Sequence, residues 1–379
     1  MAAGKGTCLG LAAAGLLLGT QMAHADCNTP MPDAVTHVAV PGHPFSAVAS
    51  ADGCTIFVSL TAKDSHVLVL KRGEGAVTIA QNLPAIGQVT GMALSPDGRF
   101  LVAANGGGVT LFDTARLIAG DDKAAMGYLN DRTGAGSIYA AFSPDQHLLF
   151  VSDERNAAIT VHDFAGILAG KGAKPIGEIR TGDAPVGLAF SPGGRLLYST
   201  SEAASAGGGC SENGGHSHGP GVLLVIDVAK AAVAPSDSVL ARVTAGCSPV
   251  RVALSPDGAR AYVSARGQNM LLAFDTARLI NDSDHALVAQ VPVGTAPVGV
   301  AAANGKVFVT NSNRFGGGDA QSVSVLDAGN LAAPQASIPA GGFPRELKLT
   351  ADGKTLLVTN YASGTLELVD MARLAEAAK

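Results

Sequence analysis

The sequence predicts an all-β fold, a seven-bladed β-propeller made of four-stranded antiparallel blades. Three observations predict it: one type of tight turn recurs seven times, the turns follow one another at a nearly constant interval, and short apolar segments flank each of them. Measured at their central residues, successive turns lie 45, 48, 48, 64, 47 and 48 residues apart, a period typical of repeat architectures. The seven turns are Ala51-Asp52-Gly53, Ser95-Pro96-Asp97-Gly98, Ser143-Pro144-Asp145, Ser191-Pro192-Gly193-Gly194, Ser255-Pro256-Asp257-Gly258, Asn304-Gly305 and Ala351-Asp352-Gly353.

Each repeat supplies four strands around its turn. In a Ser-Pro-Asp-Gly turn the proline presets the first central position, and the glycine adopts the left-handed conformation that closes a hairpin. The turn therefore joins a first strand, such as residues 185–190, to a second strand, such as residues 356–360. A third strand follows a polar loop, as at residues 109–113, and a fourth ends the repeat, as at residues 289–293. Seven such units are typical of a closed propeller.

Six of the seven third strands end in an aspartate. One interpretation is a row of catalytic carboxylates. The other, which we favour, is that each aspartate caps a short helical turn leading to the fourth strand. The six residues are Asp113, Asp163, Asp227, Asp275, Asp327 and Asp370.

The two ends of the chain complement each other. The last repeat stops after its third strand at Asp370, whereas residues 35–40 form an apolar segment that belongs to no repeat. We expect this segment to be the outer strand of the seventh blade, which would close the ring and cover an exposed sheet edge. No linker-like stretch separates the repeats, so we expect residues 26–379 to form a single domain.

Residues 1–25 have the pattern of a secretory signal peptide. Lys5 supplies the positive charge, residues 9–18 the apolar core, and Ala23-His24-Ala25 the small-residue cleavage site. We expect cleavage between Ala25 and Asp26 and a periplasmic or secreted location.

Composition excludes two classes of partner. The net charge is −5, and the 26 basic residues are scattered without a run that could follow a phosphate backbone, so nucleic-acid binding is disfavoured. Beyond the signal, no stretch approaches the ~20 apolar residues of a membrane span. We expect a monomer that engages a small molecule or a protein partner.

The expected mature chain has four cysteines, an even number that favours disulfides in an exported protein. In a propeller the first-to-second and third-to-fourth turns lie on one side, here called the turn face. The second-to-third and blade-to-blade loops lie on the other, the mouth face. Cys27 and Cys54 share the turn face, and Cys210 and Cys247 share the mouth face. The topology therefore predicts the pairs Cys27–Cys54 and Cys210–Cys247.

Propellers bind ligands at the mouth of the central channel. Arg251 and Arg345 each follow a proline at the start of an inner strand, where side chains point into the channel. They form either a site for a carboxylate, phosphate or oxyanion, or ion pairs, for instance with Glu346, that tie blades together. The polar residues that the mouth-face loops offer as ligand-binding candidates are Asp153, Glu154, Arg155, Arg266, Asn269, Asn311, Arg314, Asn360 and Tyr361, together with His43.

One spacing of 64 residues interrupts the period, and its surplus lies in the loop 201–220. His216 and His218, with Glu202 or Glu212 nearby, suggest a Zn²⁺ or Cu²⁺ site, and no other cofactor is indicated. The alternative, which we favour, is a glycine-rich lid pinned by Cys210–Cys247.

The second strands read Phe308-Val-Thr-Asn311, Leu357-Val-Thr-Asn360, Tyr262-Val-Ser-Ala265, Phe57-Val-Ser-Leu60 and Phe150-Val-Ser-Asp153. With the turns and the strand-final aspartates, this pattern resembles the YVTN-repeat (YncE-like) β-propeller family, which is related to the lactonase-like propellers. The resemblance implies an exported binding or interaction protein, our leading hypothesis. The related lactonases imply the alternative of sugar-lactone hydrolysis, with His43 as base and Arg345 as oxyanion stabiliser. Metal binding by the 201–220 loop is the third hypothesis.

Overall fold

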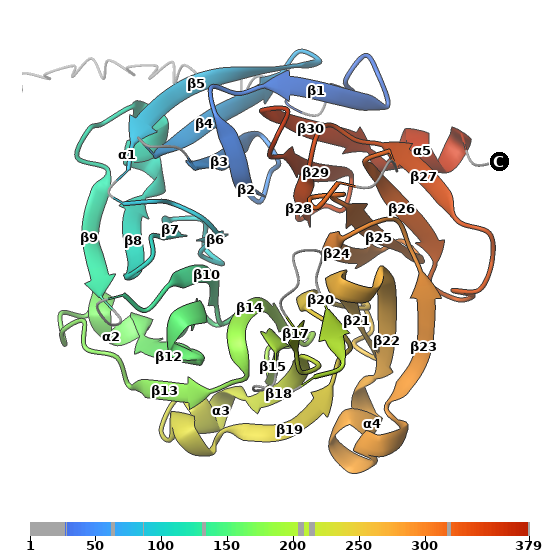
Figure 1. Cartoon of the computed structure of the whole chain (residues 1–379). Helices are drawn as coiled ribbons and strands as arrows, with labels where there is room; N and C mark the ends of the chain where they lie inside the picture. Colours follow the sequence, from blue (N-terminus) through green and yellow to red (C-terminus); the bar gives the residue numbers. More distant parts are fainter. Residues whose placement is uncertain are drawn as a thin grey trace, which may run out of the picture.

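The computed structural model describes residues 27, 29–61, 65–85, 87–130, 134–203, 208–211, 217–316 and 320–377. These residues form seven four-stranded antiparallel sheets, arranged as blades around one axis (Figure 1). The predicted fold class, an all-β seven-bladed propeller, is confirmed.

Within each blade the strands run outward from the axis in chain order, except that β1 is the outer strand of the seventh blade. The first three blades consist of β2 (His43–Ala49), β3 (Thr55–Thr61), β4 (His66–Gly73) and β5 (Ala76–Pro84); β6 (Met92–Leu94), β7 (Phe100–Ala104), β8 (Gly108–Asp113) and β9 (Ala125–Asn130); and β10 (Ser137–Phe142), β11 (Leu148–Asp153), β12 (Ala158–Asp163) and β13 (Gly177–Arg180). The fourth and fifth blades consist of β14 (Asp183–Phe190), β15 (Leu196–Ala203), β18 (Val222–Asp227) and β19 (Val239–Thr244); and β20 (Pro249–Leu254), β21 (Arg260–Ala265), β22 (Met270–Asp275) and β23 (Leu287–Pro292). The last two consist of β24 (Pro297–Ala303), β25 (Lys306–Asn311), β26 (Ser322–Asp327) and β27 (Ala336–Pro339); and β28 (Pro344–Leu349), β29 (Thr355–Asn360), β30 (Thr365–Asp370) and β1 (Val35–Ala39).

Short helices follow five of the seven third strands, and the strand-final aspartates cap them. Asp113 accepts a hydrogen bond from the backbone N–H of Arg116 at 3.0 Å, and Asp275 accepts one from Arg278 at 3.1 Å. Asp163, Asp227 and Asp370 cap their helices in the same way, so the capping interpretation is confirmed for five of the six aspartates. No helix follows Asp327, which instead accepts bonds from two backbone N–H groups of a turn. The helices are α1 (Thr114–Ala119), α2 (Phe164–Leu168), α3 (Val228–Ala231), α4 (Thr276–Asn281) and α5 (Met371–Ala377), and the 3₁₀ helices are Glu154–Asn156, Pro235–Asp237, Arg266–Gln268 and Ser283–His285.

The recurring turn is held by its own side chains. In the second blade Ser95 Oγ donates to Asp97 Oδ1 at 2.6 Å, and the same carboxylate accepts from the Arg99 N–H at 3.0 Å. Gly98 has φ of +72°, a value at which a Cβ atom would be strained. The turn sequence therefore fixes where each hairpin folds back.

A serine or threonine of the second strand joins each of several blades to the next. Six of the seven innermost strands, all except β6, are bulged near their first residues, which leaves one N–H group of each without a ladder partner. In the seventh blade Thr359 Oγ1 accepts from the Glu346 N–H at 3.1 Å and donates to the carbonyl of Phe45 in the first blade at 3.2 Å. Ser59, Thr200 and Ser264 make the same two bonds in other blades.

The segment 35–39 lies beside the last strand of the chain. Strand β1 pairs antiparallel with β30, with Val35 opposite Val369 and Ala39 opposite Thr365. The two strands run side by side at the top of the view (Figure 1). The structure also contains the two predicted disulfides, Cys27–Cys54 and Cys210–Cys247. Such disulfides are typical of an extracellular or periplasmic environment.

The core consists of apolar layers between neighbouring blades. Each cluster of buried side chains combines residues of two adjacent blades, and the one between the seventh and first blades contains Leu357, Leu368, Ile56 and Val58. Every blade thus buries both of its faces. None of the helices in the described residues is long and apolar enough to cross a bilayer.

Candidate functional site

Each blade contributes three residues to the channel, from its innermost strand or from the residues just before it. Because the strands share one register, equivalent residues form rings of seven, one residue from each blade. The upper ring, nearest the mouth face, is Phe45, Thr90, Ile138, Val186, Val250, Val298 and Arg345. The middle ring is Ser46, Gly91, Tyr139, Gly187, Arg251, Gly299 and Glu346, and the lower ring is Val48, Ala93, Ala141, Ala189, Ala253, Ala301 and Lys348.

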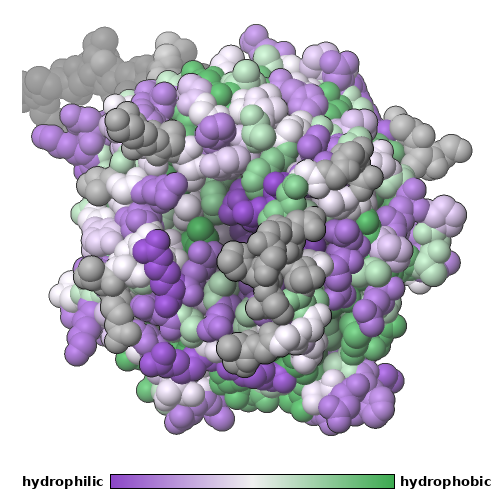
Figure 2. All heavy atoms as spheres, viewed as in Figure 1, coloured by the Kyte–Doolittle hydropathy of each residue, from purple (hydrophilic) through white to green (hydrophobic). Residues whose placement is uncertain are grey.

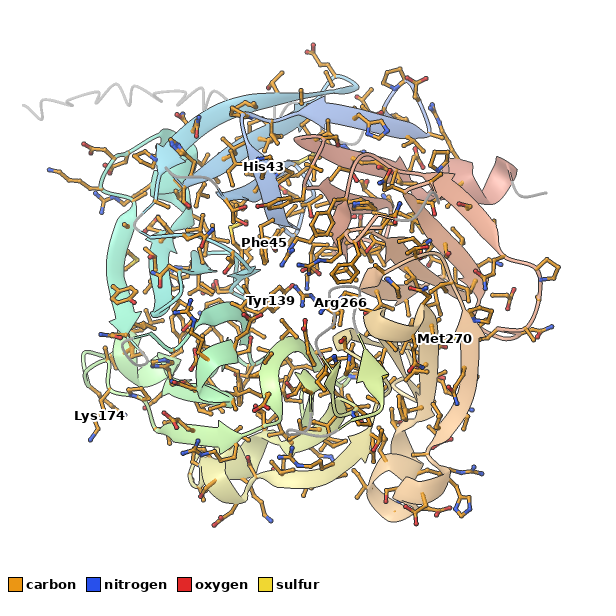
Figure 3. The ribbon with its side chains drawn as sticks, viewed as in Figure 1. His43, Phe45, Tyr139, Lys174, Arg266 and Met270 are labelled. Atoms are coloured by element: carbon orange, nitrogen blue, oxygen red, sulfur yellow. A yellow bond between two sulfur atoms is a disulfide. The ribbon has the colours of Figure 1, made fainter. Side chains whose placement is uncertain are left out.

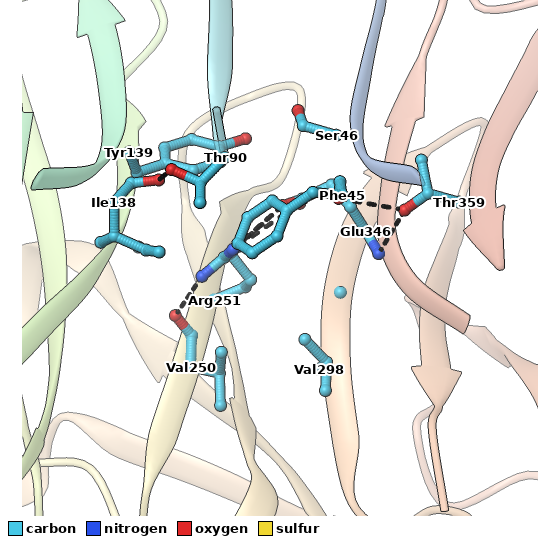
Figure 4. A network of polar contacts seen from close by, with 12 residues as sticks. Phe45, Ser46, Thr90, Ile138, Tyr139, Val250, Arg251, Val298, Glu346 and Thr359 are labelled. Carbon is cyan, nitrogen blue, oxygen red and sulfur yellow. Dashed lines mark hydrogen bonds and ion pairs between the residues drawn. The ribbon is translucent and has the colours of Figure 1, made fainter. Parts of the chain in front are cut away.

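Three large residues of the middle ring, Tyr139, Arg251 and Glu346, form what we call the plug (Figure 4). Arg251 Nη2 lies 3.0 Å from Glu346 Oε2, and Arg251 Nε donates to the same oxygen at 3.1 Å. The Arg251 guanidinium carbon lies 4.8 Å from the centroid of the Tyr139 ring. Burial disfavours the charge of Arg251, but the carboxylate of Glu346 outweighs burial and raises the pKa of Arg251. The ion pair that the sequence left as an alternative for Arg251 therefore exists, and it joins the fifth and seventh blades.

Glycines in the middle ring make room for the plug. A Cβ atom at Gly91 would lie 2.2 Å from Cδ2 of Tyr139 and 2.7 Å from the carbonyl oxygen of Ile138. The Tyr139 ring therefore lies across Gly91, on the neighbouring blade. Alternation of small and large residues in the ring is what lets three long side chains share one axis.

Above the plug, Arg345 is surrounded by aromatic rings. Its guanidinium carbon lies 3.8 Å from the centroid of Phe45, 5.7 Å from that of Phe343 and 5.9 Å from that of Tyr361. Burial and the charges of Arg251 and Arg314 lower the pKa of Arg345 to about 10. Its Nε is buried and has no hydrogen-bond partner among the described residues. Unlike Arg251, Arg345 is a cation that no carboxylate of the described chain neutralises within ion-pair distance.

His43 lies on the mouth face, on the ring of Tyr361 that Arg345 also approaches. Its ring stacks on Tyr361 with centroids 4.8 Å apart, and its Nδ1 lies 2.8 Å from the Tyr361 carbonyl oxygen. A carbonyl can only accept, so Nδ1 carries the proton and Nε2 presents a lone pair. In the view down the axis Phe45, Tyr139 and Arg266 lie around the centre, and His43 lies farther out (Figure 3).

Acidic residues complete the mouth. Burial and the nearby Glu202 raise the pKa of Glu154, although Arg251, Arg345 and Arg266 partly oppose them. Glu202 itself is held by Arg266 through two parallel hydrogen bonds of 2.9 and 2.8 Å. Hydrophilic residues gather near the centre of the face shown in the space-filling view (Figure 2).

Several predicted ligand-binding residues serve the scaffold. Asp153, Asn311 and Asn360 are buried, and their side chains bond to the third strand of their own blade, as Asn311 Nδ2 does to Ser324 Oγ at 2.9 Å. Asn269 Oδ1 accepts from the Ala296 N–H at 2.8 Å and so ties two blades. Arg155 is exposed on a 3₁₀ helix. The structure thus brings Arg345, Arg314, Tyr361, Glu154, Arg266 and His43 together at the mouth. It leaves Asp153, Asn269, Asn311 and Asn360 in structural roles.

Sequence reasoning missed two of the three aromatic residues around Arg345, Phe45 and Phe343. Phe45 occupies the same position after a proline as Arg345, so register alone could have placed it in the channel. Phe343 has a φ of +53°, a backbone conformation rare for an aromatic residue that the sequence does not signal.

The insertion 201–220 contains a small two-stranded pair, β16 (Cys210–Ser211) and β17 (Ser217–His218). His218 Nδ1 lies 2.8 Å from the Gly219 carbonyl oxygen, and its Nε2 lies 3.1 Å from Ser248 Oγ. Both ring nitrogens of His218 therefore have partners within the chain. His216 and Glu212, the other proposed metal ligands, lie outside the described residues. Within the described ranges no three His, Cys, Asp or Glu side chains form a group that could hold a metal ion.

Comparisons with known proteins agree with the fold. A model of the family described as "Lactonase, 7-bladed beta-propeller" matches residues 33–297. The structure is similar to a chain of Kuenenia stuttgartiensis hydrazine synthase, with 21% sequence identity and a TM-score of 0.67, covering 89% of this chain and 98% of that one. It is also similar to a chain of a mitotic checkpoint complex, with 16% identity and a TM-score of 0.66, covering 97% and 99%. At these identities the two structures share the fold alone, and a search of curated proteins finds no match.

Proposed function

Because the chain belongs to the lactonase family of seven-bladed β-propellers, we propose that it is an exported protein that binds a small anionic ligand at the mouth of its channel. The observation that carries the proposal is Arg345, whose buried Nε has no partner among the described residues. A guanidinium presents donors in a planar fork that matches a carboxylate or phosphate. A buried guanidinium N–H without a partner near the channel mouth is the kind of donor that such a ligand requires.

The surroundings of Arg345 support a ligand that carries a ring or an apolar body beside its negative charge. Phe45, Phe343 and Tyr361 provide the flat walls, and Arg314 lies 5.6 Å from the centroid of Phe343 and adds positive charge. Apolar walls with a few convergent polar groups are typical of small-molecule sites. Sugar acids and their phosphate esters combine these properties.

Titration calorimetry tests the proposal, with gluconate, glucuronate and 6-phosphogluconate as probes and glucose as the neutral control. Arg345→Met should weaken anion binding by roughly 10- to 150-fold, because it removes a hydrogen bond to a charged group. Arg155→Met, which removes an exposed arginine of the same face, should leave binding unchanged. Equal affinity of the wild type and Arg345→Met for every bound anion would refute the proposal.

A second candidate function is hydrolysis of a lactone at the same place. The observation that favours it is His43, whose Nε2 lone pair is available for a proton. Nε2 would take a proton from water as the water oxygen bonds to the lactone carbonyl carbon, while Arg345 stabilises the oxyanion. The ring C–O bond then breaks, and the imidazolium returns its proton to the leaving alkoxide, giving the hydroxy acid.

A pH-stat assay on glucono-δ-lactone tests this second function. His43→Gln and Arg345→Met should each lower kcat/KM by roughly 10²- to 10³-fold if the mechanism holds. A rate equal to the uncatalysed one, or a rate that both variants retain, would exclude it. Anion binding without turnover would leave the binding function in place.

A further inference from the structure

Below the plug the channel opens into a cavity that the proposed function does not use. Its volume is 530 Å³, within the range of roughly 300–1,000 Å³ typical of small-molecule sites. It is bounded by Tyr139, Arg251 and Glu346 of the plug at one end and extends to Ala351, in the first-to-second turn of the seventh blade. The cavity therefore lies toward the turn face, on the other side of the plug from Arg345.

At the level of the lower ring, the wall of this cavity is apolar in six blades and charged in one. The whole lower ring lines it, and six of its seven residues are alanine or valine. The seventh is Lys348, in β28. Small side chains widen the channel at this level, and a single ammonium group breaks the symmetry of the wall.

The Tyr139 hydroxyl and the Lys348 ammonium are hydrogen-bond donors of the cavity that an acceptor on a ligand could pair with. Tyr139 is 2% exposed, and although the Lys348 ammonium lies close to its hydroxyl, the hydroxyl proton has no acceptor among the described residues. The Lys348 Nζ lies 5.2 Å from the centroid of the Tyr139 ring, and no carboxylate of the described chain lies within ion-pair distance of it. Both groups can donate to one oxygen-bearing ligand, and leaving a buried hydroxyl without a partner is unfavourable.

We propose that the lower half of the channel is a second binding site, which takes a small organic carboxylate with an apolar tail. The carboxylate would accept hydrogen bonds from Lys348 and Tyr139, and the tail would lie along the ring of alanines. An inorganic anion would leave that apolar wall exposed to water, and an uncharged apolar molecule would leave Lys348 and Tyr139 unpaired.

The charges around the cavity agree with a carboxylate. Glu346 also lines the cavity, but its Oε2 lies 3.0 Å from Arg251, so its negative charge is compensated within the plug. Burial disfavours the ammonium of Lys348, yet Tyr139 and Glu346 outweigh burial and raise the pKa of Lys348. The lysine therefore stays protonated at neutral pH and acts as a cation, not as an amine nucleophile.

Calorimetry with the straight-chain carboxylates from acetate to octanoate tests the site. Each added methylene should tighten binding by about fourfold until the tail fills the cavity. Lys348→Met keeps the length of the side chain and removes the charge, so it should weaken binding by roughly 10- to 150-fold. Tyr139→Phe should weaken it by roughly two- to tenfold, and Lys354→Met, which removes an exposed lysine of the adjacent turn, should have no effect.

A second readout comes from absorbance. The chain has five tyrosines and no tryptophan, so a tyrosine difference spectrum on adding octanoate is readily seen, and Tyr139→Phe should abolish it. Arg345→Met should leave octanoate binding unchanged, which separates this site from the mouth. Affinity that is independent of tail length, or that survives Lys348→Met in protein with an unchanged Tm, would overturn the proposal. Loss of octanoate binding in Arg345→Met, with binding retained in Lys348→Met, would also overturn it.

Discussion

The two halves of the channel are built from the same seven strands in the same register, yet they offer different chemistry. Above the plug, aromatic rings and arginines converge on Arg345. Below it, alanines surround a single lysine, Lys348. The backbone repeats sevenfold at both levels, so the difference comes only from side chains. In a propeller, candidate sites are the positions where one blade departs from the others.

The residues that distinguish the two halves, Arg345 and Lys348, lie on one strand. β28 carries Arg345 toward the mouth, Glu346 in the plug and Lys348 toward the turn face. The equivalent strand of the fifth blade carries one charge, Arg251, which Glu346 neutralises. Because Glu346 pairs with Arg251 in the plug, the two cations of β28, Arg345 and Lys348, are left to bind ligands. The plug therefore decides whether the two halves act separately.

The largest effect should come from breaking the plug. Glu346→Gln leaves the buried Arg251 without its counter-ion, so the free energy of unfolding should fall by about 3–5 kcal/mol in urea titrations. The double variant Arg251→Met with Glu346→Leu removes both charges and should recover most of the loss. A single variant as stable as the wild type would mean that the ion pair contributes little to holding the fifth and seventh blades together.

The disulfide of the mouth face should come next. Replacing Cys210 and Cys247 by alanine frees a loop of 37 residues and should lower the free energy of unfolding by about 2–4 kcal/mol. Because Cys247 belongs to the mouth face, anion affinity at Arg345 should change while octanoate affinity at Lys348 does not. Equal changes at both sites would show that the halves are coupled through the plug.

The fold could be predicted because its signals are local. A Ser-Pro-Asp-Gly turn uses its own side chains, as Ser95 and Asp97 do, so seven copies reveal seven hairpins without any long-range information. The disulfide pairs followed from which face each loop occupies. The role of the second-strand hydroxyls could not be read in this way, because Thr359 bonds to Phe45, which is 314 residues distant.

The site was predictable only in part. A proline before an inner strand placed Arg251 and Arg345 in the channel, but sequence could not tell which of them Glu346 would neutralise, since that depends on the blades facing each other across the axis. Lys348 was not predicted as a site residue, because a lysine that alternates with leucines is typical of a solvent-facing strand position. The sequence predicts Asp153 and Asn360 in polar loops, but both are the last residues of second strands and bond to their own third strands.

Removing a hydroxyl that joins two blades should lower the free energy of unfolding by a moderate amount and affect both halves of the channel equally. Thr359→Val leaves the N–H of Glu346 and the carbonyl of Phe45 without their bonds, so unfolding should become easier by about 1–3 kcal/mol. Thr36→Val is the matched control, because the Thr36 hydroxyl is buried without a partner among the described residues and its loss should cost nothing. Similar losses in both variants would show that the bridge contributes no more than a methyl-for-hydroxyl exchange.

The smallest effect should distinguish the halves by pH. Burial and Glu202 raise the pKa of Glu154 above its ordinary value, so this carboxyl gains its proton at a higher pH than an ordinary glutamate does. Protonation removes a negative charge beside Arg345, so anion affinity at the mouth should rise on acidification, by roughly two- to tenfold. Glu154→Gln isolates the carboxyl by removing its contribution to the pH dependence of anion affinity. Lys348 keeps its proton over this range, so octanoate affinity should be flat between pH 8 and 6. A common pH profile for both ligands would mean that they share one site, because only the mouth contains a carboxyl that titrates in this direction beside an unpaired cation.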